Sequence, residues 1–318
     1  MSFIEESHYH PSKKDQDLKF VVKKDKFTAY IMLDGHGLYG HEFVRKVELI
    51  VFRKLATLND SIITYESVLS TLCKEVGNTI GPDLSIYLDE FYSEFLNRLF
   101  IDTNDELACE KYNNTGCAMS VVIITPSRMY VANVGDSDVY LFNNKTDLIK
   151  LTTDHSGLSP TEMYRLKSYP NTEIFYVSNK SQLKQVWNSD KTLLPIDPTF
   201  DYMINEAGEP ITYVCYLDRM DLRFPIIKSM CLSRSIGDYF FKTIGVISEP
   251  SISIFNKPIS NEILLIGSDG FWDGWKKDDL KYTLCSDPSN IFSKSMKLNE
   301  VAFGRFVDDN SLFVIRFY

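Results

Sequence analysis

The sequence lacks the features that would place it in a membrane or on the secretory route. None of its apolar runs approaches the length of a membrane span. Its first ten residues, MSFIEESHYH, have neither the cationic start nor the apolar stretch of a signal peptide. Its six cysteines form no Cys-x-x-Cys pair, so the usual spacing of a zinc site is absent. Reduced thiols in the cytoplasm are therefore expected, with the nucleus as the alternative.

Positive charge is scarce as well. The chain has 34 Lys and Arg residues against 43 Asp and Glu residues, which gives a net charge of −9. Its densest basic stretch, KKDKF at residues 23–27, is short and fits a solvated loop. We therefore expect no nucleic-acid partner, because phosphate contacts need clustered Lys and Arg. Acidic side chains that gather in one cleft would instead bind a divalent cation.

The chain is long and apolar enough to form a packed core. It has 318 residues, 44% of them hydrophobic, and no Pro-, Gly- or Ser-rich linker divides it. A single domain over residues 1–318 is therefore expected, and we expect it to be a monomer.

Apolar residues recur at helical spacing early in the chain and in strand-like runs later. The spacing predicts helices over residues 41–55, 65–76 and 83–100, and another after Ser159. The predicted strands lie at 28–33, in an antiparallel meander over 118–142, and at 262–270 and 310–318. Residues before 28 are expected to be irregular apart from a short strand at 20–22, and 169–228 yields no assignment. Because helices and strands come in separate groups, the pattern favours an α+β fold.

Four aspartates lie where apolar strands end or begin. Asp34, Asp136 and Asp269 follow strands beside a glycine, and Asp309 precedes the last strand. Each one alone fits ordinary turn chemistry, since Asp next to Gly is common in turns. The ends of strands can also converge on one edge, where four carboxylates would repel one another unless a cation lay between them. An oxygen-rich cluster of this kind suits Mg²⁺ or Mn²⁺.

Several stretches, taken in order, resemble the sequence blocks of the metal-dependent serine/threonine protein phosphatases of type 2C. The resemblance covers nearly the whole chain, with a weaker match at HPSKKDQDLKFVV near the start. The matching stretches are YIMLDGHG, YNNTGCAMSVVIITPSRMYVANVGDSDVYLF, LTTDHSGLSPTEMYRL, LSRSIGDYFFK with GVISEP, LLIGSDGFWDGW and DDNSLFVIRF. Six ordered blocks are far more specific than any one of them.

The resemblance implies a fold and an activity. The fold would be a four-layer α-β-β-α sandwich, with two antiparallel sheets flanked by helices and residues 169–228 as a flap-like insertion. The activity would be Mg²⁺- or Mn²⁺-dependent hydrolysis of phosphoserine and phosphothreonine in a phosphoprotein substrate, by attack of a metal-activated water.

The resemblance also implies a role for individual residues. Asp34 would bridge two ions, and Asp269 would be shared with a third, looser ion. His36 stands where the family has its general acid, the group that protonates the departing oxygen. The implied metal ligands are Gln16, Asp17, Asp34, the carbonyl of Gly35, Asp136, Asp269, Asp273 and Asp309.

The sequence departs from the family pattern near the site. Ser12 replaces an arginine that binds phosphate, so Lys13 or Lys14 is expected to take over that contact. Gln16 replaces the more common glutamate, which predicts a weaker second metal site and a need for more Mg²⁺ or Mn²⁺. Asp138 replaces an arginine and adds negative charge. These departures leave a catalytically inactive type 2C-like scaffold or binding module as the alternative function.

Overall fold

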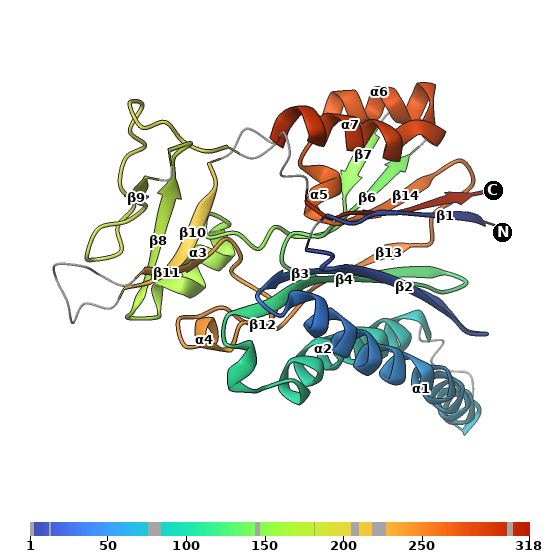
Figure 1. The fold of residues 1–318 in the computed structure, drawn as a ribbon. Helices are drawn as coiled ribbons and strands as arrows, with labels where there is room; N and C mark the ends of the chain where they lie inside the picture. The colour runs from blue at the N-terminus through green and yellow to red at the C-terminus, as the bar shows by residue number, and fades with distance from the viewer. Residues whose placement is uncertain are drawn as a thin grey trace.

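The computed structural model describes residues 3–12, 14–75, 84–143, 147–180, 182–204, 210–217, 227–303 and 308–318. Two antiparallel sheets stack face to face, helices cover the outer side of each, and a smaller third sheet lies beside them (Figure 1). The predicted α+β class, with antiparallel sheets flanked by helices, is confirmed. Within the described ranges, none of the helices combines the length and the apolar character needed to cross a membrane.

The first sheet carries two long helices on its outer face. Its strands run in the order β13-β5-β4-β3-β2, and β12 pairs with β4. Buried side chains of α1 and α2 pack on this sheet in one apolar cluster that includes Val47, Leu55 and Leu96. The elements are β2 (Asp17–Lys23), β3 (Thr28–Gly37), β4 (Thr115–Ile124), β5 (Arg128–Val134), β12 (Ile236–Gly237), β13 (Ser251–Asn256), α1 (Gly40–Glu75), α2 (Leu84–Glu106) and the short η1 (Glu110–Tyr112).

The second sheet has the order β1-β15-β14-β6-β7 and carries the later helices. A cluster with Tyr30, Val122 and Phe313 fills the space between the two sheets, and another with Trp272 and Leu284 packs the helices onto the second sheet. The elements are β1 (Phe3–His10), β6 (Asp138–Asn143), β7 (Asp147–Lys150), β14 (Ile263–Gly267), β15 (Asn310–Phe317), α5 (Asp269–Trp272), α6 (Lys277–Ser286), η2 (Pro288–Asn290) and α7 (Ile291–Phe303).

Part of the unassigned segment 169–228 forms a third sheet, with the order β11-β10-β8-β9. The fully buried Trp187 packs in one apolar cluster with Ile174 and Val214 of this sheet, and its indole N–H donates to Glu173 at 2.7 Å. That residues 169–228 are a flap-like insertion within a single domain stays a prediction. The elements are β8 (Thr172–Val177), β9 (Leu183–Gln185), β10 (Thr212–Leu217), β11 (Ile227–Met230), α3 (Pro160–Lys167) and α4 (Tyr239–Lys242).

Three sequence-based expectations about local structure are wrong. The irregular N-terminal stretch contains β1, whose side chains are half-buried or exposed, so it carries no apolar signal and is held by pairing with β15. The two helices expected between residues 41 and 75 are one continuous helix, α1. The meander over 118–142 breaks after β5, because Gly135 has φ +87° and the chain crosses to the second sheet as β6.

The stretch Asp34-Gly35-His36-Gly37 does not form a turn. It continues β3, paired with β4 from Thr28 to Gly37. The strand therefore carries Asp34 and His36 in extended backbone, with their side chains held relative to the rest of the sheet.

A buried ion network fixes α3 to the loop before β12. Glu162 is 1% exposed, and its two carboxylate oxygens accept hydrogen bonds from Arg234 at 2.6 Å, Ser233 at 2.9 Å and Arg165 at 2.5 Å. Burial raises the pKa of Glu162, but the hydrogen bonds from Arg234 and Arg165 outweigh it and hold the pKa at about 2. The network stabilises the segment that leads to Asp238.

We expect Glu162→Gln to destabilise the protein by about 3 kcal/mol at neutral pH, because two arginines would lose their buried partner. The pKa of Glu162 is lower in the folded than in the unfolded chain, so its contribution is present above about pH 4.5. It is lost as the pH falls toward about 2. Urea unfolding at pH 7 and pH 4 checks this, and a difference between wild type and variant that does not shrink at the lower pH would contradict it.

Candidate metal centre

Three carboxylates meet at one end of the sandwich. Asp34 lies near the end of β3, Asp136 in the crossing from β5 to β6, and Asp269 at the start of α5 after β14. Each offers an oxygen atom, and these atoms all lie within 4.8 Å of one another. The backbone N–H of Asp269 also donates to the Asp34 carboxylate at 3.3 Å. The structure thus brings together three of the aspartates that the sequence singled out.

The electrostatics of this cluster favour a cation. Burial raises the pKa of Asp34 well above its ordinary value, and the Asp269, Asp17 and Asp136 carboxylates raise it further. The pKa of Asp136 is raised as well. Burial has the largest effect, and among the charged groups the Asp269 carboxylate has the largest. Carboxylates crowded in this way gain from a positive charge between them, and hard oxygen donors are those that Mg²⁺ and Mn²⁺ prefer. The donor set therefore fits a divalent ion.

Asp17 extends the acidic cluster on the neighbouring strand. It pairs directly with Asp34 in the register of β2 and β3. Its side chain is buried, and one carboxylate oxygen has no hydrogen-bond partner among the described residues. Burial has the largest effect and raises the pKa of Asp17, the Asp269 and Asp309 carboxylates raise it further, and the Ser268 and Ser311 hydroxyls offset this only in part. A buried acceptor without a donor is costly unless a cation or water satisfies it, so Asp17 also fits a metal centre.

Asp309 holds the N-terminal segment in place. Its carboxylate accepts hydrogen bonds from the backbone N–H groups of Ser12, Gln16 and, at 3.2 Å, Asp17. The Gln16 side chain points to the end of β3, where its amide N–H donates to the carbonyl of Gly37 at 2.8 Å. Asp309 thus lies at the cluster and binds the segment that carries two other predicted ligands.

The other predicted metal ligands, Asp273 and Gly35, and the predicted phosphate-binding lysines are not part of the group formed by Asp34, Asp136 and Asp269. Asp273 is exposed, one helical turn after Asp269, and its charge raises the pKa of Asp136. The N–H of Gly35 donates to the Gln16 carbonyl at 3.1 Å, which fixes this end of β3. Lys14 is exposed, and Lys13 lies outside the described residues. Their contact with phosphate stays a prediction.

His36 has a carboxylate partner, Asp238, that is not among the site residues expected from the sequence. Its Nε2 atom lies 2.7 Å from the Asp238 carboxylate, which is almost fully buried. Burial lowers the pKa of His36, but the Asp238 carboxylate outweighs this effect and raises the pKa. Asp238 itself is held by its N–H bond to the Thr115 carbonyl at 2.9 Å. The close approach depends on Gly116, where an added Cβ would lie 2.2 Å from a carboxylate oxygen of Asp238.

Asp138, the departure from the family pattern that adds negative charge, is neutralised locally. Its buried carboxylate lies 2.5 Å from the ammonium group of Lys150 and accepts a hydrogen bond from Thr152 at 2.7 Å. The charge at this position is therefore paired on the second sheet. Lys150 comes from the neighbouring strand β7, so the pairing depends on the register between β6 and β7, which the sequence does not show.

One sequence signal could have identified Asp238. Asp238 follows Gly237, as Asp136 follows Gly135. A neighbouring glycine was also part of the pattern that singled out Asp34 and Asp269. Gly135 and Gly237 both have positive φ, near +87°. The same reasoning applied to all such pairs would have included Asp238 among the candidates.

Comparison with known proteins agrees with this geometry. The family model described as Protein phosphatase 2C matches residues 82–284, well over half of the chain. Probable protein phosphatase 2C 1 of Arabidopsis thaliana is 24% identical over 271 residues, covering 81% of this chain and 51% of the relative. Probable protein phosphatase 2C 41 of the same plant is 22% identical, covering 79% of this chain and 60% of the relative. The chain thus spans about half to three fifths of these curated relatives.

Solved structures share the fold at low sequence identity. The crystal structure of serine-threonine phosphatase 2C from Toxoplasma gondii superposes with a TM-score of 0.65 at 14% identity, covering 99% of this chain and 94% of that one. A C. elegans sex determining protein superposes with a TM-score of 0.59 at 14% identity, covering 98% of this chain and 64% of that one.

Proposed function

The chain belongs to the protein phosphatase 2C family, and from this premise we propose that it is an active Mg²⁺- or Mn²⁺-dependent phosphatase of phosphoserine and phosphothreonine in proteins. The observation that carries the proposal is the cluster of Asp34, Asp136 and Asp269, whose oxygen atoms lie within 4.8 Å of one another. A protein with only a binding role has no need to hold three repelling carboxylates together.

The ligands for two core ions would come from Asp34, the carbonyl of Gly35, Asp269, Asp309, Gln16 and Asp17, while Asp136 and Asp273 would join Asp269 at a third ion. When bound, divalent ions would supply an activated water and screen the charge of the phosphate. Gln16 brings an oxygen but no charge, so we expect the second ion to bind more weakly than it would to a glutamate. Asp309 orients the backbone of Ser12, Gln16 and Asp17 by accepting hydrogen bonds from their N–H groups.

His36 would donate the proton that the departing serine or threonine oxygen needs. Because Nε2 is the atom bonded to Asp238, the carboxylate orients the ring and favours its protonated form. Asp238 does not need to touch the substrate, so it is a positioning residue. Lys14, exposed at the edge of this segment, would attract the phosphate as a point charge in place of the arginine that Ser12 replaces.

We expect phosphate release from para-nitrophenyl phosphate and from a phosphothreonine peptide to require added Mn²⁺ or Mg²⁺ and to stop with a chelator. Calorimetric titration of the same protein with Mn²⁺ should show binding. Metal binding without turnover of either substrate would favour the alternative of an inactive binding module. Turnover that survives the chelator would overturn the metal-dependent chemistry.

A further inference from the structure

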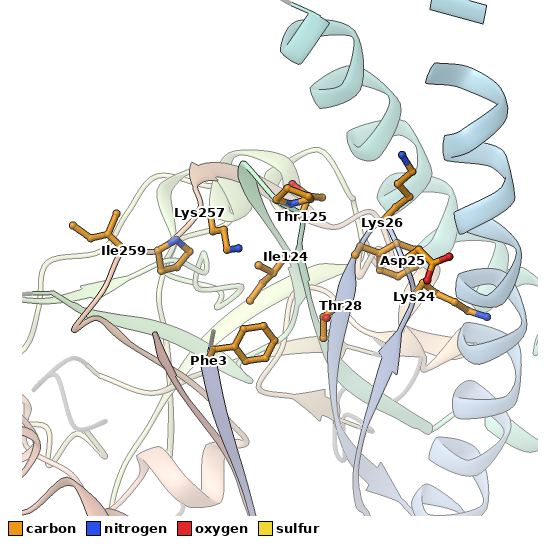
Figure 2. A pocket seen from close by; sticks show the side chains of 12 residues that line it. Phe3, Lys24, Asp25, Lys26, Thr28, Ile124, Thr125, Lys257 and Ile259 are labelled. Carbon is orange, nitrogen blue, oxygen red and sulfur yellow. The ribbon is translucent and has the colours of Figure 1, made fainter. Parts of the chain in front are cut away.

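The pocket in Figure 2, of about 520 Å³, lies at the β2–β3 and β4–β5 turns, at the other end of β3 from the acidic cluster. Its walls belong to different parts of the core, because Phe27 packs with the helices of the first sheet and Ile124 packs between the two sheets. Its charges are mixed as well, with Asp25 between Lys24 and Lys26. The pocket therefore has no uniform surface that would select a ligand, whereas a buried histidine near the metal centre has a defined set of contacts.

This histidine, His155, lies in the loop between β7 and α3, beside the crossing that carries Asp136. It is 2% exposed. Its Nδ1 atom lies 3.1 Å from the backbone nitrogen of Gly135, and its Nε2 atom lies 2.8 Å from the hydroxyl of Ser251 in β13. A backbone N–H can only donate, so Nδ1 must accept the bond from Gly135. The ring proton therefore lies on Nε2, which donates to Ser251.

The surroundings keep the imidazole of His155 neutral. Burial lowers the pKa of His155 to about 3, and Arg234 is the largest charged contributor to this effect. Arg165 adds to it, whereas Glu162 and Asp154 act in the opposite direction without outweighing it. The ring is therefore uncharged near neutral pH, and Nδ1 keeps the lone pair that accepts the backbone N–H.

Gly135 is held at both of its backbone groups. Its N–H bonds to the imidazole, and its carbonyl accepts a hydrogen bond from the side-chain amide of Asn133 at 3.4 Å. The same amide also donates to the carbonyl of Thr153 at 2.9 Å, so both holds come from the loop after β7 or depend on it. Gly135 has φ +87°, and an added Cβ would lie 2.5 Å from the Cβ of Ala118. Since Asp136 is the next residue, these contacts determine where its carboxylate begins.

We propose that His155 is a positioning residue for the metal centre, because its bond to Gly135 fixes the backbone from which Asp136 reaches the acidic cluster. This role presupposes the proposed function, in which Asp136 joins Asp269 and Asp273 at a third ion. Without the acceptor, the N–H of Gly135 would be left unpaired in a buried place, and the crossing would shift to satisfy it. The third ion would then bind more weakly, whereas the two core ions would keep ligands that this bond does not hold.

The test compares two variants of the full chain that each keep one of the two bonds of the ring. His155→Asn places an amide oxygen at the position of Nδ1, so it still accepts from Gly135 but loses the bond to Ser251. His155→Gln reaches one atom further, to the position of Nε2, so it keeps Ser251 and leaves Gly135 without an acceptor. Ser251→Ala is the matched control, because it removes a partner of the ring but not the acceptor for Gly135.

Calorimetry measures Mn²⁺ binding, and phosphate release from para-nitrophenyl phosphate is followed against the Mn²⁺ concentration. His155→Gln should weaken the loosest Mn²⁺ about tenfold, because groups that orient a metal ligand typically contribute about ten- to a hundredfold to affinity. It should also raise the Mn²⁺ concentration for half-maximal release and leave the tightest Mn²⁺ unchanged. His155→Asn and Ser251→Ala should bind like the wild type. In an Asp136→Asn background, His155→Gln should have no further effect, because both changes act on one ligand.

Equal weakening of the tight and loose ions would overturn the proposal, because His155 would then only support the fold. A Gln variant that binds like the Asn variant would overturn it as well. His155→Leu, which keeps neither bond, replaces the Gln variant if circular dichroism shows that the latter is unfolded. If the wild type binds Mn²⁺ and releases phosphate but the variants do not differ from it, the positioning role fails and the proposed function stands. A wild type that binds no Mn²⁺ overturns both.

Discussion

Replacing Asp34 with Asn should abolish Mn²⁺-dependent phosphate release and, at the same time, stabilise the metal-free protein. The loss of activity follows from the central place of Asp34, whose oxygen lies within 4.8 Å of ligand atoms of both Asp136 and Asp269. The gain in stability follows from the repulsion that raises the pKa of Asp34, because the amide carries no charge. We expect the melting temperature in chelator to rise by roughly 2–4 °C, or about 1 kcal/mol.

Two measurements check this pair of effects. Phosphate release is assayed with Mn²⁺, and thermal unfolding is followed with Mn²⁺ and with chelator. Mn²⁺ should raise the melting temperature of the wild type but not of Asp34→Asn, because a ligand that binds only the folded state stabilises it. Asp278→Asn, an exposed change in α6, is the control and should behave like the wild type. If Asp34→Asn keeps its activity, or melts lower than wild type in chelator, the acidic cluster is not the metal centre.

Replacing His36 with Ala should slow hydrolysis of a phosphothreonine peptide by about 10²–10⁴-fold, the usual contribution of a general acid. An aryl phosphate should be much less affected, because its leaving oxygen needs little protonation. Asp238→Asn should produce the same pattern with smaller losses, since the ring would keep its place but lose the charge that favours its protonated form.

Comparing the phosphothreonine peptide with the aryl phosphate distinguishes a loss of proton donation by His36 from a general disruption of the site. Thr243→Ala changes an exposed residue just after α4 and should leave both rates unchanged. If His36→Ala or Asp238→Asn slows the two substrates equally, the residue supports the site in another way. Circular dichroism of each variant shows whether the fold persists.

Local signals in the sequence were sufficient to predict the strands next to the clustered aspartates. The apolar runs before Asp34, Asp136 and Asp269 predicted strands that end at these residues. Strand β3 continues past Asp34 to Gly37, but the structure does bring the three aspartates together. The resemblance to a family supplied the order and the roles, which strand propensity alone cannot provide. The α+β class followed from the grouping of helices and strands.

The contacts that could not be predicted from the sequence are pairings between segments far apart in the chain. Strand β1 has a half-exposed pattern and is defined only by its partner β15. The bond from His36 to Asp238 joins residues 202 positions apart, and the charge of Asp138 is balanced by Lys150 on another strand. Such contacts produce no periodic pattern in a single sequence, so they can be identified only from the assembled sheets.

The pairing of β1 with β15 has a consequence for how the molecule is made. The register joins Phe3 to Phe317 and His10 to Asn310, so β1 can pair only after the segment that carries β15 has been synthesised. A contact of such long range closes slowly, because the chain must first bring its two ends together. Asp309 immediately precedes β15 and fixes the backbone of Gln16 and Asp17. A nascent chain can therefore bury the core under α1 before it assembles its acidic site, which delays metal binding until the segment with Asp309 and β15 has been synthesised.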